Sequence, residues 1–180
     1  MSVNLSLTDL PQREGACKHE TVSWCPNESV GTPTLSVDSS EPIGVDVTAL
    51  VVDTGILVTV AAHVNATGVC VRCLTDITRS LDVDHTELFY LPETRDALVR
   101  EGDEEAEDAF VIESDTLNIE PLLIDAIVPK LPFQPLCEPA CPGLCPECGV
   151  RLAEAEAGHH HERIDERWSA LAGLFDKETE

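Results

Sequence analysis

Residues 56–64 read Ile-Leu-Val-Thr-Val-Ala-Ala-His-Val, and this stretch decides the fold because every second side chain is apolar. Such alternation predicts a β-strand with one buried face. After the segment Cys70-Val-Arg-Cys73 the alternation resumes over residues 77–89, although three polar side chains fall on the apolar side. We therefore predict a long antiparallel hairpin that carries the Cys-x-Arg-Cys segment at its tip.

Shorter elements are expected on both sides of this hairpin. Apolar residues alternate with small or polar ones from Ile43 to Val47, which predicts another strand. Residues 110–112 predict a short strand, and residues 121–128 predict a short helix that begins at a proline and ends before one. Residues 165–175 predict a last helix, with one apolar face. The expected fold class is α+β, an antiparallel sheet with short C-terminal helices and a cysteine-rich metal knuckle.

Four parts of the chain are expected from its composition. Residues 1–40 mix prolines and glycines with polar residues and predict a loosely structured segment. Residues 41–136 would form the β-rich core domain, interrupted by an acidic, solvated loop at 101–108 that is either a spacer or a contact for a basic partner. Residues 137–150 would form the knuckle, and residues 151–180 a linker and the last helix.

The charge of the chain is strongly negative. It has 34 acidic and 11 basic residues among 180, a formal net charge of −23. A phosphate backbone is repelled by such a surface, because nucleic-acid affinity comes largely from Lys and Arg. The charge suits a basic partner, although a generally acidic proteome would also explain it.

The location is expected to be cytoplasmic. The first residues lack the basic and apolar regions of an export signal, and the uncharged run 54–71 alternates and contains polar residues, which favours a strand over a membrane span. The eight cysteines are not expected to form disulfides there, because the cytoplasm keeps thiols reduced. Clustered cysteines there more often bind a metal.

A second group of cysteines lies near the C-terminus. Cys137, Cys141, Cys145 and Cys148 fall within twelve residues, and Cys145-Pro-Glu-Cys148 is followed by Gly149, as in a zinc knuckle. These four residues are the favoured zinc ligands. The alternative is a split site in which Cys70 and Cys73 join Cys145 and Cys148; the first pair is the poorer knuckle, because Leu74 replaces the glycine.

The cysteines are also compatible with three roles other than zinc binding. These are a metal-free cluster of reduced thiols, an iron–sulfur site, and a redox-active Cys-x-x-Cys. The run His159–His161 is either a solvated linker or a source of further metal ligands. Cys17 and Cys25 are expected to be incidental. The sequence contains no nucleophile elbow, P-loop or His-Glu-x-x-His motif, so no catalytic residue is assigned.

Three motifs in the expected order resemble those of the YceD family: Cys-x-Arg-Cys-Leu at 70–74, Leu-Pro at 131 followed by the cysteine cluster up to Gly149, and Ile-Asp-Glu-Arg-Trp at 164–168. The resemblance implies a role in normal accumulation of large-subunit (23S) ribosomal RNA and no catalytic residues. Family genes commonly neighbour that of a small basic large-subunit ribosomal protein. Some members keep the Cys-x-Arg-Cys pair without the C-terminal cluster, which favours two independent cysteine groups and hence the local site of Cys137, Cys141, Cys145 and Cys148.

Three functions follow as hypotheses. The first is an assembly factor whose acidic surface contacts a basic ribosomal protein or a preribosomal particle. The second is direct binding of ribosomal RNA through a small basic spot formed by Arg72, a candidate partner-binding residue at the hairpin tip, together with Arg79. The third is a thiol oxidoreductase.

Overall fold

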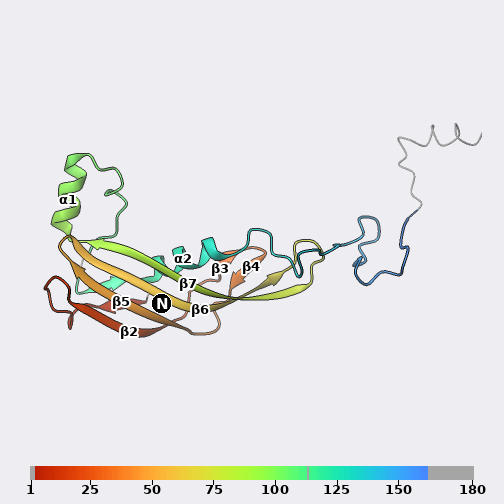
Figure 1. Cartoon of the computed structure of the whole chain (residues 1–180), viewed down its shortest axis with the longest axis horizontal. Coiled ribbons are helices and arrows are strands. Elements are labelled where there is room, and N and C mark those ends of the chain that lie inside the picture. The colour runs from red at the N-terminus through yellow and green to blue at the C-terminus, as the bar shows by residue number, and fades with distance from the viewer. Residues whose placement is uncertain (1–2, 113, 162–180) are drawn as a thin grey trace, which may run out of the picture.

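The computed structural model describes residues 3–112 and 114–161. It is an α+β structure, as expected. The strands are β1 (Asn4–Ser6), β2 (Cys17–Trp24), β3 (Val30–Thr32), β4 (Leu35–Val37), β5 (Ile43–Val52), β6 (Gly55–Val69), β7 (Asp76–Tyr90) and β8 (Thr116–Asn118). The helices are α1 (Pro92–Glu101), α2 (Glu120–Ile127) and the 3-10 turn η1 (Val128–Lys130). Six of the strands form one antiparallel sheet (Figure 1), and β1 pairs with β8 in a separate two-stranded ribbon.

The predicted hairpin is confirmed and organises the sheet. Strands β6 and β7 pair without interruption from Gly55↔Tyr90 to Val69↔Asp76, and the two cysteines of the first motif lie in the turn between them. The other edge of β6 pairs with β5 over its first half and with β4 near its end. A Cβ atom at Gly68 would lie 2.0 Å from the carbonyl oxygen of Thr34, so this close approach requires glycine.

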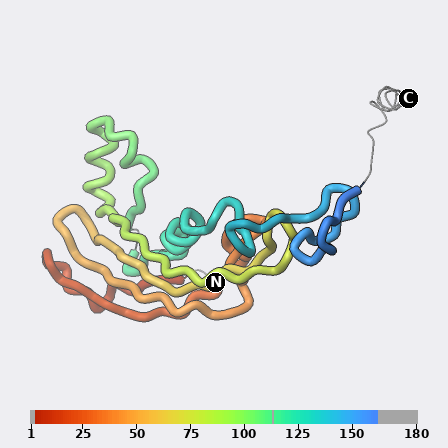
Figure 2. Tube along the Cα trace, turned by 45° about the vertical axis from the view of Figure 1, so that its right-hand side comes forward, coloured from red at the N-terminus to blue at the C-terminus, as the bar shows by residue number. Residues whose placement is uncertain are grey.

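The core lies between the sheet and α2. Helix α2 rests on the inner side of the curved sheet, as Figure 2 shows. Its Leu122, Leu123 and Ile127 are fully buried and share one apolar cluster with alternate residues of the strands, such as Val47 and Val60. The alternation in the sequence is thus the burial pattern of the sheet. The opposite sheet face carries mainly Thr, Asp, His and Ser side chains, with a half-buried row of Leu50, Leu57 and Leu88 among them.

Residues 1–40 do not match the expectation of a loose segment. Strand β2 pairs residue for residue with β5, from Cys17↔Leu50 to Trp24↔Ile43. Trp24 is 1% exposed, and its indole N–H donates to Glu120 of α2. The expectation was wrong because β2 is an edge strand with few apolar residues, so its periodicity is weak.

Two other elements differ from those expected. Residues 110–112 form only a single parallel bridge, between Val111 and Tyr90. Helix α1 was not anticipated, because it buries no side chain and therefore has no apolar stripe. It begins at Pro92 and ends at Glu101, and the following Gly102, with φ of 89°, forms a left-handed cap. Helix α2 and the turn η1 agree with the expected helix at 121–128.

The C-terminal part leaves the sheet at the hairpin tip. After η1 the chain runs to the turn between β6 and β7, and residues 141–161 extend beyond the end of the sheet (Figures 1 and 2). The acidic block 101–108 forms exposed turns after α1, although Ala106 is buried. The helix expected at 165–175 lies outside the described residues. Among the described helices, none has the length and apolar character needed to cross a membrane.

Candidate metal centre

The hairpin tip folds as a knuckle around Cys70. The Cys70 N–H donates to the carbonyl of Thr75 at 2.8 Å, and the Leu74 N–H donates back to the Cys70 carbonyl at 2.9 Å. This closure places Leu74 in the left-handed region, with φ of 57°. For a residue other than glycine that conformation costs roughly 1–2 kcal/mol, so the turn retains a strained residue.

The second knuckle repeats these contacts. The Cys145 N–H donates to Val150 at 2.8 Å, and the Gly149 N–H donates to Cys145 at 2.9 Å. Gly149 has φ of 74°, so it occupies the position that Leu74 holds in the first knuckle. Leu74 adopts the left-handed conformation of the glycine at the energetic cost given above, so the first pair forms the same backbone knuckle with a strained residue.

The loop after η1 brings two more thiols to the first knuckle. The Val71 N–H donates to the carbonyl of Pro135 at 2.9 Å, which fixes this loop beside the tip. The Sγ atoms of Cys70 and Cys141 are then 3.7 Å apart, and those of Cys73 and Cys137 are 3.6 Å apart. All four sulfurs lie within 4.8 Å of one another. Four thiolates about 2.3 Å from a tetrahedral zinc would be about 3.8 Å apart, so the cluster fits that ion.

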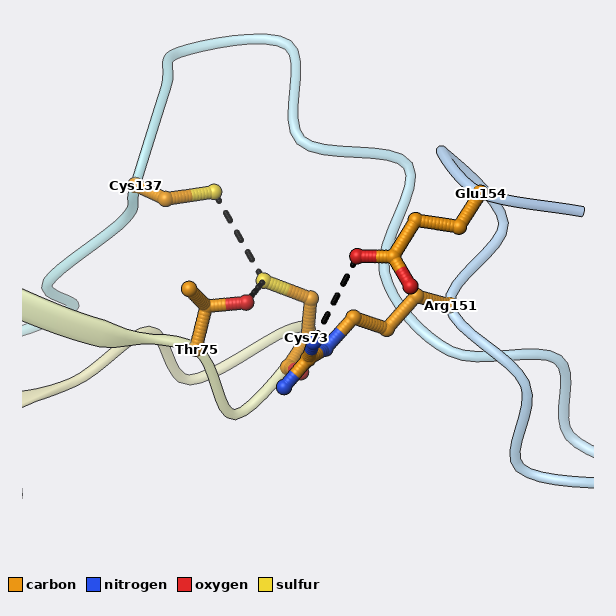
Figure 3. A network of polar contacts seen from close by, with 5 residues as sticks. All are labelled: Cys73, Thr75, Cys137, Arg151 and Glu154. Carbon is orange, nitrogen blue, oxygen red and sulfur yellow. Dashed lines mark hydrogen bonds and ion pairs between the residues drawn. The ribbon is translucent and has the colours of Figure 1, made fainter.

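The environment favours two of the four thiolates directly. Burial opposes ionisation of Cys70, but backbone N–H groups of Cys137, Cys73 and Arg72 outweigh it and lower the pKa of this thiol to about 6. The hydroxyl and the backbone N–H of Thr75 lower the pKa of Cys73. The hydroxyl oxygen of Thr75 is 3.2 Å from the Sγ of Cys73 (Figure 3).

The other two thiols hold their protons more tightly. The neighbouring sulfurs of Cys141 and Cys73 raise the pKa of Cys137 to about 12, and burial raises the pKa of Cys141. Each close sulfur pair therefore joins one thiol of lowered pKa to one of raised pKa. A divalent ion would replace the two remaining protons and supply the positive charge that four adjacent thiolates need.

Three arginines hold the cluster together through backbone carbonyls. Arg72, predicted as a partner-binding residue, donates from Nη1 to the carbonyl of Cys141 at 2.9 Å. Arg79 donates to the carbonyl of Leu136. Arg151 donates from Nε to the carbonyl of Cys73 at 3.4 Å and pairs with Glu154, as Figure 3 shows. These three bonds tie the hairpin tip, the loop after η1 and the following segment to one another.

The structure groups the cysteines in neither of the two ways expected from spacing. Cys70 and Cys73 meet Cys137 and Cys141, whereas Cys145 and Cys148 lie with His159 and His161. The reason lies in the tertiary structure, because the length of the hairpin decides which loop its tip meets. The spacing of cysteines along the sequence does not reveal this contact. Cys17 and Cys25 are exposed and belong to neither group.

Several contributing residues were not assigned from the sequence. Thr75 and Arg151 carry no motif, and the pairing of His159 with His161 skips the histidine between them. The repeated pattern of two Cys-x-x-Cys knuckles was a usable signal, since each knuckle supplies two ligands and so implies two partner pairs. Whether an ion occupies either group stays a prediction.

Comparison with known proteins gives one family. The model of the family "Large ribosomal RNA subunit accumulation protein YceD" matches residues 58–175. The chain is 36% identical over 180 residues to an uncharacterized protein of Mycobacterium tuberculosis, covering 99% of this chain and 84% of the relative. An uncharacterized protein of Mycobacterium leprae is 32% identical over 175 residues, covering 96% and 77%.

A more distant relative is the uncharacterized protein YlbN of Bacillus subtilis, 27% identical over 112 residues, which are 62% of this chain and 61% of YlbN. No solved structure matches the chain. The family match covers well over half of the chain and includes both cysteine groups, and the mycobacterial relatives span nearly all of it. On this basis the chain belongs to the YceD family.

Proposed function

We propose that this protein is a non-enzymatic assembly factor for the large ribosomal subunit, active in the cytoplasm and supporting accumulation of 23S ribosomal RNA. The observation that carries the proposal is the buried four-cysteine cluster, in a family named for accumulation of the large ribosomal RNA. Such a cluster would hold zinc with all four positions filled by protein, which is the arrangement of structural sites rather than catalytic ones.

The ligands of this ion would be Cys70, Cys73, Cys137 and Cys141. Zinc would supply a crosslink between the hairpin tip and the loop after η1, since each provides two ligands. The sequence favoured other groupings, and the sulfur distances support this one instead. A thiol oxidoreductase that works through the four-cysteine cluster is disfavoured, because Cys70 is fully buried and Cys73 and Cys141 are nearly so. The redox motif expected from the sequence is Cys145-x-x-Cys148, whose Cys148 is exposed, and thiol titration with metal analysis of the purified protein tests that alternative.

The proposed partner is a small basic ribosomal protein of the large subunit, or a preribosomal particle contacted through protein. The exposed face of the sheet supports this choice. Asp46 and Asp84 lie in one row across Ala61, and Asp82 is 94% exposed beside them. These exposed aspartates would attract a basic partner at long range, although Asp84 also pairs with Lys130 and Asp82 with His63, and the attraction would weaken with salt.

A salt-dependent pull-down with the basic ribosomal protein tests the proposal. A variant with Asp46, Asp82 and Asp84 all changed to Asn should bind more weakly at low salt. A control with Glu104, Glu105 and Glu107 changed to Gln removes the same charge from the acidic block, and should bind like the wild type. Absence of binding at low salt would rule out direct contact with the basic ribosomal protein. An equal loss of binding in both variants would show only an effect of net charge.

Direct binding of ribosomal RNA is the second candidate. It is favoured by one observation, that Arg72, Arg79 and Arg151 gather at the hairpin tip. Their donation to backbone carbonyls and the net charge of −23 speak against it. A gel shift with 23S ribosomal RNA fragments separates the two candidates, because RNA binding that needs these arginines and no protein partner would replace the first proposal.

A further inference from the structure

The segment after the four-cysteine cluster is ordered without an apolar core. Among residues 142–161 only Gly143 and Cys145 are buried, and the apolar Val150 and Leu152 remain 37% and 36% exposed. The backbone nevertheless forms a series of closed turns, including the bridge between Leu144 and Arg151. A stretch this short cannot be stabilised by burial alone, so another interaction must hold it.

Four metal-ligating side chains converge inside this segment. The Sγ of Cys148 lies 3.4 Å from the Nε2 of His159, and that nitrogen lies 3.1 Å from the Nε2 of His161. Together with the Sγ of Cys145, these atoms all lie within 4.8 Å of one another. Two sulfurs and two imidazole nitrogens bound to one tetrahedral zinc would be separated by about 3.3 to 3.8 Å, given bond lengths of about 2.3 and 2.0–2.1 Å.

The local fold aims these atoms at one point. Cys145 and Cys148 belong to the second knuckle, which repeats the hydrogen bonds of the first. A turn from Glu156 to His159 returns the chain to this knuckle. His159 and His161 then meet edge to face, with ring centroids 4.7 Å apart, while His160 turns away and its Nδ1 contacts the carbonyl of Gly158. His159 and His161 therefore point toward the two cysteines, whereas His160 does not.

We propose that Cys145, Cys148, His159 and His161 form a second metal site, a Cys2His2 zinc site that is separate from the four-cysteine cluster. Sulfur and imidazole are the ligands that zinc prefers, and four protein ligands leave no open position. The site orders the C-terminal extension, in the way that metals fold small domains without a core. This inference does not depend on the ribosomal role.

The second site also stiffens the first. The Leu152 N–H donates to the carbonyl of Gly143 at 2.9 Å, and Arg151 donates to Cys73. Arg151 and Leu152 lie between Cys148 and His159, in the segment that the second ion would close. Zinc there therefore holds Arg151 against the four-cysteine cluster, and the two ions form one rigid unit at the end of the sheet.

Metal analysis of the full chain, purified without a histidine tag, tests the proposal. We expect one zinc per chain to be lost from each of Cys148→Ser, His159→Ala and His161→Ala, relative to the wild type. His160→Ala is the matched control and should retain the wild-type content. Cys73→Ser should keep the zinc that the histidine variants lose. These histidines lie outside the apolar core, so their replacement does not disturb it.

Cobalt substitution gives a second readout, because thiolate-to-cobalt charge transfer grows with the number of sulfur ligands. The difference spectrum between wild type and His159→Ala should be that of a site with two thiolates, and Cys73→Ser should remove a site with four. Unchanged zinc content and spectra in both His159→Ala and His161→Ala would overturn the proposal. So would an equal loss in His160→Ala, which would indicate loose binding by the histidine run.

Discussion

Arg72 is expected to act on the metal centre rather than on a partner, and Arg72→Ala tests this. Its guanidinium donates to the carbonyl of Cys141 and so joins the two segments that supply the four thiolates. A hydrogen bond from a charged donor contributes about 1.5–3 kcal/mol. Arg72 is exposed to water, which places this bond at the lower end of the range.

This contribution predicts the change in zinc affinity. Without the ion no metal crosslink joins the two segments, so we expect this bond to be populated less in the ion-free state than in the zinc-bound state. A loss of about 1.4 kcal/mol weakens binding tenfold, and Arg72→Ala should raise the zinc Kd by about that factor. Competition with a chromogenic chelator measures it. Arg100→Ala is the control, since Arg100 bonds within α1, to the carbonyl of Asp96.

A zinc Kd within twofold of the wild type would refute this reasoning. If the same variant then lost its ribosomal partner, Arg72 would be a contact residue, as its position at the tip first suggested. Arg72→Lys distinguishes the two further. Lysine keeps the charge but not the planar fork, so it should restore binding of an acidic or phosphate partner better than it restores the bond to Cys141.

Three further predictions concern the fold that supports the site. Leu123→Ala in α2 removes a fully buried side chain and should lower the free energy of unfolding by about 3 kcal/mol in urea titrations, whereas Ile124→Ala, 39% exposed, should cost less than about 1 kcal/mol. Gly68→Ala places a Cβ 2.0 Å from a carbonyl oxygen and should destabilise the sheet by more than about 2 kcal/mol, but Gly44→Ala, with nothing within 4 Å, should lower the Tm by only a degree or two. Chelation of zinc should open residues 137–161 to protease and leave the sheet intact, because its core is a separate cluster; simultaneous loss of far-UV signal would contradict that division.

The sequence predicts those parts of the fold that have strong local periodicity. The hairpin β6–β7 and strand β5 follow from alternation, and α2 follows from its two prolines and apolar face. Strand β2 and helix α1 do not follow. The first lies at an edge with one buried side chain, and the second buries none, so neither has a pattern that a sequence can display.

The site divides in the same way. The residue types and the knuckle motif point to zinc, because both are local properties of the chain. The partners of each knuckle are set by where a fifteen-residue strand ends relative to the loop after η1, and that is a property of the packed sheet. Thr75 and Arg151 each contact the cluster through a single hydrogen bond, and the spacing of residues in the sequence does not predict such a bond.

Three arginines gather around the four-cysteine cluster at the hairpin tip. A zinc ion with four thiolates carries a net charge of −2, and the rest of the chain is already strongly acidic. Three of the 11 basic residues donate to carbonyls of this unit, which places scarce positive charge around the cluster. The proposed basic partner would instead meet the exposed aspartates of the sheet face or, as the alternative that the charge-matched control addresses, the acidic block 101–108. Zinc retention and partner binding should therefore respond to different residues and to salt in different degrees.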